Sequence, residues 1–166
     1  MRRAFIVPLS VLLMAGCSQS TDSTDIGPAP LSSRIGMAED SGGRETETAA
    51  AYLQEPRFAE ADIVRGELLS LACQACHTLG AGQAHLLGPN LYGIFGRVSA
   101  GSDGFDYSAE LRSAKLAWTP AALESWLADP AEFLPGNNMV FAGYSSITDR
   151  RDLIAFLLHK TGGLAE

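Results

Sequence analysis

The hydrophobic and polar positions divide the 166-residue chain into three parts. An apolar run follows two arginines at the N-terminus and ends at residue 16, a layout typical of an export signal. Residues 17–58 are mostly small and polar, and such sequence buries too little surface to offset the entropy of ordering. Apolar residues then recur at helical spacing. The pattern predicts an export signal over 1–16, a flexible acidic tether over 17–58 with a helical turn over 49–53, and one domain over 59–166.

Capping residues mark the helices expected in this domain. Asp62, Ser108 and Thr119 each stand before a helical segment, and Pro120 occupies the first helical position after Thr119. The helix that begins after Thr119 is expected to stop at Asp129, because proline follows. We expect Thr148 to cap the last helix. No segment alternates apolar and polar residues convincingly, so the expected fold class is all-α.

The charge of the chain limits its partners. With 12 basic and 19 acidic residues the formal charge is −7, which argues against a nucleic-acid partner. Residues 17–62 carry 3 basic and 9 acidic residues, and residues 63–166 carry 7 and 10. The acidity therefore lies mainly in the predicted tether. No apolar run approaches 20 residues, so no ordinary transmembrane helix is expected.

The end of the apolar N-terminal run resembles a bacterial lipoprotein signal. The chain reads Leu-Met-Ala-Gly from residue 13 and continues with Cys17. In such signals the cysteine is lipidated and becomes the mature N-terminus. The alternative, an ordinary cleaved signal with an incidental cysteine, needs an A-x-A-like site, and none is evident. The expected location is the periplasmic face of a bacterial membrane, anchored in the bilayer through Cys17, with inner or outer membrane left open.

One short motif indicates which cofactor the chain binds. Cys73, Cys76 and His77 form the sequence C-x-x-C-H, which is the attachment motif of c-type haem. The two thiols can each bond one vinyl group of the porphyrin, and the histidine can bind the iron. A zinc site would need a second cysteine pair, but Cys17 is the only other cysteine. A thioredoxin-like dithiol would need a βαβ setting, which is absent.

A second axial ligand can be sought among the methionines and histidines. Of four methionines, only Met139 falls in the predicted domain, on a polar loop where a core-filling side chain would be unusual. His85 lies eight residues from His77 and is expected on the same side of the ring. His159 is expected on the solvated side of the last helix. Met139 is the favoured ligand.

With these residues in place, the chain from about residue 62 to 163 resembles a class I cytochrome c of the mitochondrial and bacterial c2 type. The resemblance is carried by residues 73–78, 88–97, 105–108, 118–119, 126–130, 135–143 and 151–157. It implies a small all-α fold in which helices and loops wrap around one covalently attached haem c.

The resemblance also implies residue roles. His77 would be the proximal iron ligand and would donate its Nδ1 proton to the carbonyl of Pro89. Met139 would be the distal ligand. His85 would be a structural histidine that bonds a loop carbonyl. Trp126 would pack near Met139.

Four further residues are assigned around the haem by the same resemblance. Arg97, Tyr107 and Trp118 would hydrogen-bond a buried haem propionate, because a buried carboxylate needs such partners. Phe141 would lie near the haem edge. One departure from the family pattern is Gly66, which stands one residue nearer Cys73 than the usual glycine of the first helix.

The implied function is electron transfer rather than catalysis. We expect a monomeric, membrane-tethered carrier that moves single electrons between respiratory complexes, such as a quinol-oxidising complex and a terminal oxidase. The alternatives are a dedicated electron acceptor for a periplasmic dehydrogenase and a haem peroxidase or gas sensor, which needs an open distal site. The lysine ring that mitochondrial members use for docking is missing. Neutral or acidic residues stand there instead: Ala72, Ala131, Glu132, Asn138, Ser145 and Ser146.

Overall fold

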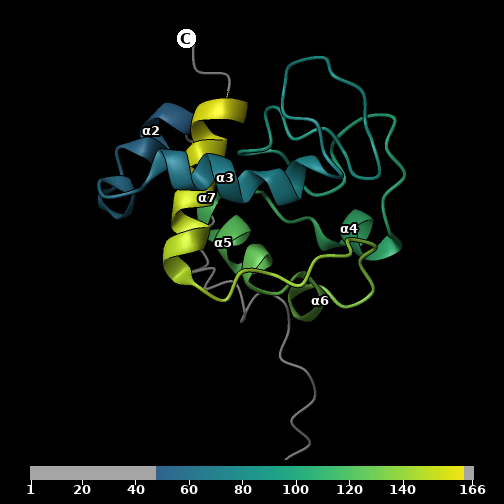
Figure 1. Ribbon diagram of the computed structural model, residues 1–166. Coiled ribbons are helices and arrows are strands. Elements are labelled where there is room, and N and C mark those ends of the chain that lie inside the picture. The colour runs from purple at the N-terminus through teal and green to yellow at the C-terminus, as the bar shows by residue number, and fades with distance from the viewer. Residues whose placement is uncertain (1–47, 163–166) are drawn as a thin grey trace, which may run out of the picture.

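The computed structural model describes residues 48–162 (Figure 1). The predicted export signal, Cys17 and the tether up to residue 47 lie outside the described residues. The described part is helical, with one isolated bridge between Val98 and Ala117 and no strand. Its elements are α2 (Ala49–Leu53), η1 (Pro56–Phe58), α3 (Ile63–Gln74), α4 (Ala109–Ala114), α5 (Pro120–Ala128), α6 (Pro130–Phe133) and α7 (Ile147–Thr161). The all-α prediction is confirmed.

Three predicted caps begin their helices as expected. The Asp62 carboxylate accepts a hydrogen bond from the backbone N–H of Arg65 at 2.9 Å at the start of α3. The Ser108 and Thr119 hydroxyls do the same at the starts of α4 and α5. Each cap satisfies a backbone donor that the first helical turn leaves without a partner.

One predicted helix boundary was wrong, and another was right but incomplete. The N-cap of α7 is Ser146, whose hydroxyl accepts from the backbone N–H of Asp149, so Thr148 lies inside the first turn. Asp129 ends α5, as predicted, but it also caps α6, because its carboxylate accepts from the N–H groups of Ala131 and Glu132. Proline after Asp129 stops one helix and suits the first position of the next.

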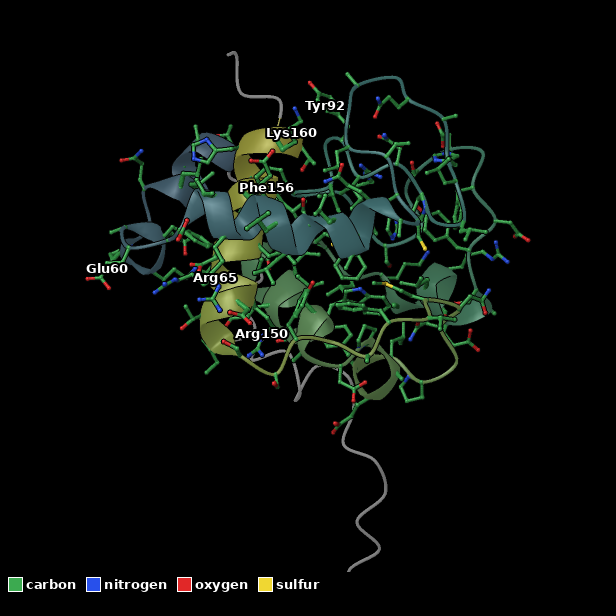
Figure 2. All side chains as sticks on the ribbon, in the orientation of Figure 1. Glu60, Arg65, Tyr92, Arg150, Phe156 and Lys160 are labelled. Atoms are coloured by element: carbon green, nitrogen blue, oxygen red, sulfur yellow. The ribbon has the colours of Figure 1, made fainter. Side chains whose placement is uncertain are left out.

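The C-terminal helix α7 forms the centre of the core. It packs against α3, α5, α2 and η1, and Figure 1 shows α3 crossing it. At the crossing a Cβ on Gly66 would overlap the carbonyl oxygen of Asp152 and lie 2.8 Å from Cβ of Phe156, a residue labelled in Figure 2. The buried Asp152 carboxylate also accepts from the backbone N–H of Asp62 at 3.1 Å. Gly66 therefore allows close helix contact despite its shifted position.

The folded region begins earlier than the boundary predicted at residue 59. The predicted turn over residues 49–53 is confirmed as α2, but it belongs to the core and not to a tether. Ala49, Tyr52 and Phe58 are buried, and the Tyr52 ring lies 6.4 Å from that of Phe95. A few apolar side chains in a polar stretch are enough to attach it to α7. None of the helices within residues 48–162 is long and apolar enough to cross a membrane.

Tyr52→Ala should show that this segment is part of the fold. Removing a side chain that is only 7% exposed leaves a cavity against α7, and the free energy of unfolding should fall by roughly 2–4 kcal/mol. Thermal unfolding of the haem-loaded protein measures it. Gln54→Ala, an exposed neighbour, is the matched control and should change little. Equal stability of both variants would show that the segment contributes nothing.

Candidate functional site

One cavity collects the predicted site residues of the domain. Its volume is about 460 Å³, and its lining includes apolar residues of α5 and α7 such as Leu123 and Leu157. All ten predicted residues line it: Cys73, Cys76, His77, Pro89, Arg97, Tyr107, Trp118, Trp126, Met139 and Phe141. The volume lies in the range of cofactor sites. Residues separated by up to 68 positions in sequence thus share one apolar pocket.

The C-terminal end of α3 presents the two cysteines to the cavity. Cys73 lies in the last turn of α3, and its carbonyl accepts from the N–H groups of Cys76 and His77 at 3.0 and 2.9 Å. Both cysteines are free thiols. Burial raises the pKa of Cys73 to about 11, so this thiol stays protonated at neutral pH. Two thiols on one helical turn are thereby available for covalent attachment.

His77 is held in one orientation and one tautomer. Its Nδ1 lies 2.7 Å from the carbonyl oxygen of Pro89. Because a carbonyl can only accept, Nδ1 carries the proton and Nε2 keeps its lone pair. Burial lowers the pKa of His77, although the bond to Pro89 works in the opposite direction, so the ring is neutral and able to bind a metal ion.

Gly88 makes this arrangement sterically possible. A Cβ at position 88 would lie 2.6 Å from Nδ1 of His77, closer than real Cβ atoms approach. The backbone N–H of Gly88 donates to the carbonyl of Cys76 at 2.8 Å, which ties the loop to the cysteine motif. A residue with a side chain would push the imidazole away from Pro89.

The loop that carries Met139 is fixed by a residue that the sequence analysis did not single out. The Asn137 side-chain oxygen accepts from the backbone N–H of Met139 at 2.8 Å. Its amide donates to the carbonyls of Pro130 and Leu134 at 2.7 and 2.8 Å. An asparagine two residues before a candidate ligand is the signal of an Asx turn, and that spacing could have revealed it.

An aromatic cluster forms part of the wall of the cavity. The rings of Trp118 and Trp126 meet edge to face at 5.3 Å, and Trp126 meets Phe133 in the same way at 5.8 Å. Trp126 is only 6% exposed. Edge-to-face pairs of this kind stabilise a rigid apolar wall.

The three side chains that were predicted to donate hydrogen bonds to a propionate differ in the hydrogen bonds that they make in the structure. The Arg97 guanidinium donates to the backbone carbonyls of Asn90, Tyr92 and Gly93, which orders this loop. Within the described residues, no hydrogen bond engages the Tyr107 hydroxyl or the Trp118 indole N–H. Donors without partners in a cavity wall suit an anionic group bound inside it. Their role toward a propionate stays a prediction.

The two remaining histidines make the contacts that were expected of them: His85 bonds a loop carbonyl, and His159 faces solvent. His85 Nδ1 accepts from the backbone N–H of Asn90 at 2.9 Å, so Nε2 carries the proton and donates to the carbonyl of Asp103 at 2.9 Å. His85 thus joins two loops and has no ring nitrogen left for a metal. His159 is exposed on α7.

These features fit a haem. The cavity is lined mainly by apolar side chains, two free thiols lie at its wall, and a neutral imidazole with a free Nε2 stands beside them. Met139 offers a thioether sulfur in the same cavity, and polar donors are available for carboxylates. A covalently attached haem with histidine and methionine ligands uses each of these groups.

Comparison with known proteins agrees with this chemistry. No model of a known protein family matches the chain. It is 44% identical over 108 residues to cytochrome c of Chlamydomonas reinhardtii, a match that covers 63% of this chain and 96% of the relative. Cytochrome c2 of Agrobacterium tumefaciens is 38% identical over 102 residues, covering 60% and 92%.

A solved structure gives the same result for the fold. Cytochrome cH from Methylobacterium extorquens superposes with a TM-score of 0.56 at 38% identity, covering 60% of this chain and all of that protein. The chain therefore belongs to the class I cytochromes c, which hold one covalently attached haem c and act as electron carriers rather than as enzymes.

Proposed function

We propose that this chain is a membrane-tethered electron carrier on the periplasmic side of a bacterial membrane, passing single electrons between respiratory complexes such as a quinol-oxidising complex and a terminal oxidase. The observation that carries the proposal is the cavity shared by His77, Met139 and the two cysteines. Cys73 and Cys76 would hold the haem covalently, with His77 and Met139 as axial ligands. When bound, the haem supplies an iron that takes up and releases one electron.

The residues around the cavity suit fast electron transfer better than they suit the binding of an external ligand to the iron. Pro89 fixes the orientation of His77, and Asn137 fixes the backbone of Met139. Trp118 and Trp126 add buried aromatic surface to the wall of the cavity that Met139 also lines. If His77 and Met139 both held the iron, the site would change little when its charge changes. It would also leave no open position of the kind that a peroxidase or gas sensor needs.

The tether and the location are proposed from the sequence. The N-terminal run followed by Cys17 supports export and lipidation. Because residues 49–58 belong to the folded region, we limit the proposed linker to residues 17–47. A polar chain of that length has a typical end-to-end distance of roughly 30 Å, enough to keep a carrier at high local concentration near partners in one membrane.

Cys17→Ser tests the anchor. If Cys17 carries lipid, this variant should leave the membrane fraction and appear in the soluble periplasm with an unchanged haem spectrum. The wild-type mass should exceed that of the processed peptide plus one haem by the mass of the acyl groups. A Cys17→Ser protein that stays in the membrane fraction would contradict the proposed lipid anchor. The assignment of the haem site would not be affected.

Electron transfer to partners should depend only weakly on salt. The positions that form a docking ring of lysines in mitochondrial members are here exposed neutral or acidic residues, including Ala72, Ala131 and Glu132. Without concentrated opposite charges there is little attraction for salt to screen. We expect the second-order rate to change by less than about twofold between 0.05 and 0.2 M salt, measured by stopped flow. A steep fall would contradict an apolar or mixed docking face.

A further inference from the structure

Helix α3 turns most of its larger aliphatic side chains toward solvent, and only Leu69 packs against the core. Val64, Leu68 and Leu71 expose 70%, 64% and 61% of their surface, and Ala75 just beyond the helix is exposed as well. The side of α3 that faces α7 holds the small residues Gly66 and Ser70. An ordinary surface helix has the opposite pattern, with apolar residues inward. We call Val64, Leu68, Leu71 and Ala75 the α3 stripe.

The charges near the α3 stripe do not suit a lipid surface. The only basic residue of α3, Arg65, is labelled in Figure 2 and pairs with Asp149 on α7. Glu67 is exposed on the same helix. Helices that lie on membranes combine an apolar face with free basic residues, which anionic headgroups attract. Here the basic side chain is already paired, and the free charge has the wrong sign.

The spacing of the α3 stripe matches a helix–helix contact. Its members follow one another at intervals of 4, 3 and 4 residues, which is the a/d spacing of a coiled-coil seam. If two copies of α3 pair antiparallel about a twofold axis, Leu68 of one copy lies opposite Leu71 of the other. Val64 then lies opposite Ala75, so a larger side chain meets a smaller one in both outer layers.

The same register avoids a clash of charges. In this antiparallel pair Glu67 of one copy lies beside Gln74 of the other, so its carboxylate meets an amide and not a second carboxylate. The surface is therefore self-complementary in size and brings no like charges together, as a twofold contact between identical chains requires.

We propose that the α3 stripe is a contact site for a second copy of this chain. Three partly exposed aliphatic side chains cover a few hundred Å² at most, well below the roughly 800 Å² per partner of a stable complex. The pair is therefore transient, and at low concentration the chain is a monomer, as the sequence predicts. Ala72 lies next to the α3 stripe and lines the cavity, so pairing brings two candidate haem sites to one contact.

Translational diffusion measured by NMR on the reduced, haem-loaded protein tests this proposal. The full mature chain is used with Cys17→Ser, which removes the proposed acyl acceptor and keeps the folded region. Between about 10 µM and 1 mM the diffusion coefficient of this reference protein should fall by up to about 1.3-fold as pairs form. Added salt should strengthen the association, because residues 63–166 carry 7 basic and 10 acidic residues.

Two variants on this background locate the contact. Leu68→Asp introduces a charge at the centre of the α3 stripe on an exposed position, and its diffusion coefficient should stay constant with concentration. Ile147→Asp is the matched control, because Ile147 exposes 66% of its surface on α7 instead, and it should associate like the reference protein. Circular dichroism verifies that both variants are folded.

Three results would overturn the proposal. The first is a reference protein that stays monomeric throughout the concentration range. The second is association that Leu68→Asp leaves intact or that Ile147→Asp abolishes equally. The third is a reference protein that does not self-associate but binds phosphatidylcholine vesicles, with this binding lost in Leu68→Asp. That result would assign the α3 stripe to lipid. Diffusion needs no electron transfer, so failure here is distinct from failure of the proposed function.

Discussion

Replacing Met139 with alanine is expected to remove the sulfur-to-iron absorption band at the red edge of the oxidised spectrum. Met139 lines the cavity that holds His77, and it is the only methionine within residues 48–162. Without its thioether the distal position opens, so the reduced protein should bind carbon monoxide rapidly at neutral pH. Because His/Met ligation raises the reduction potential, the potential should fall by about a few tenths of a volt.

A matched control for this variant lies elsewhere in the chain. Met37→Ala makes the same change outside residues 48–162 and should leave the absorption band, the potential and the slow reaction with carbon monoxide as they are in the wild type. Persistence of the band in the Met139→Ala protein would remove Met139 as the ligand. Loss of the band in both variants would point to general damage.

Much of the fold could be predicted because its signals are local. Asp62, Ser108 and Thr119 begin helices through hydrogen bonds to N–H groups three residues away, so their effect is visible in a short window of sequence. The cysteine motif is likewise contained in five residues. The grouping of ten distant residues around one cavity was predictable only through the resemblance to a known family, because no local pattern encodes it.

What could not be predicted depends on tertiary contacts. Residues 48–58 have the composition of a linker, yet Tyr52 and Phe58 are buried, because α7 and residues such as Phe95 offer them an apolar surface. Arg97 was expected to serve a propionate, but its guanidinium also donates to three loop carbonyls, which sequence alone does not reveal. The exposed aliphatic side of α3 has the same origin, since a close crossing with α7 requires small residues on the inner side.

Gly66→Ala is expected to lower the stability of the domain strongly, although alanine is the better helix former. A methyl group there would overlap the carbonyl oxygen of Asp152 and approach Cβ of Phe156 at 2.8 Å. Both contacts belong to α7 at or next to its backbone, so no flexible side chain can move aside and α3 must shift. Overpacking of this kind outweighs the gain in helix propensity of about 1 kcal/mol. A net loss of about 2 kcal/mol lowers the melting temperature by roughly 10 °C.

Thermal unfolding of the haem-loaded variants by circular dichroism measures this effect, and Glu67→Ala provides the comparison. Glu67 is the next residue of α3 and is exposed, so its truncation should change the unfolding free energy by less than about 0.5 kcal/mol. Since α3 also carries Cys73, its displacement should disturb the cavity, and the sulfur-to-iron absorption band should weaken in the Gly66→Ala protein alone. A Gly66→Ala protein as stable as the wild type would show that α3 and α7 do not cross at this residue, and the register between the cysteine motif and the C-terminal helix would then have to be revised.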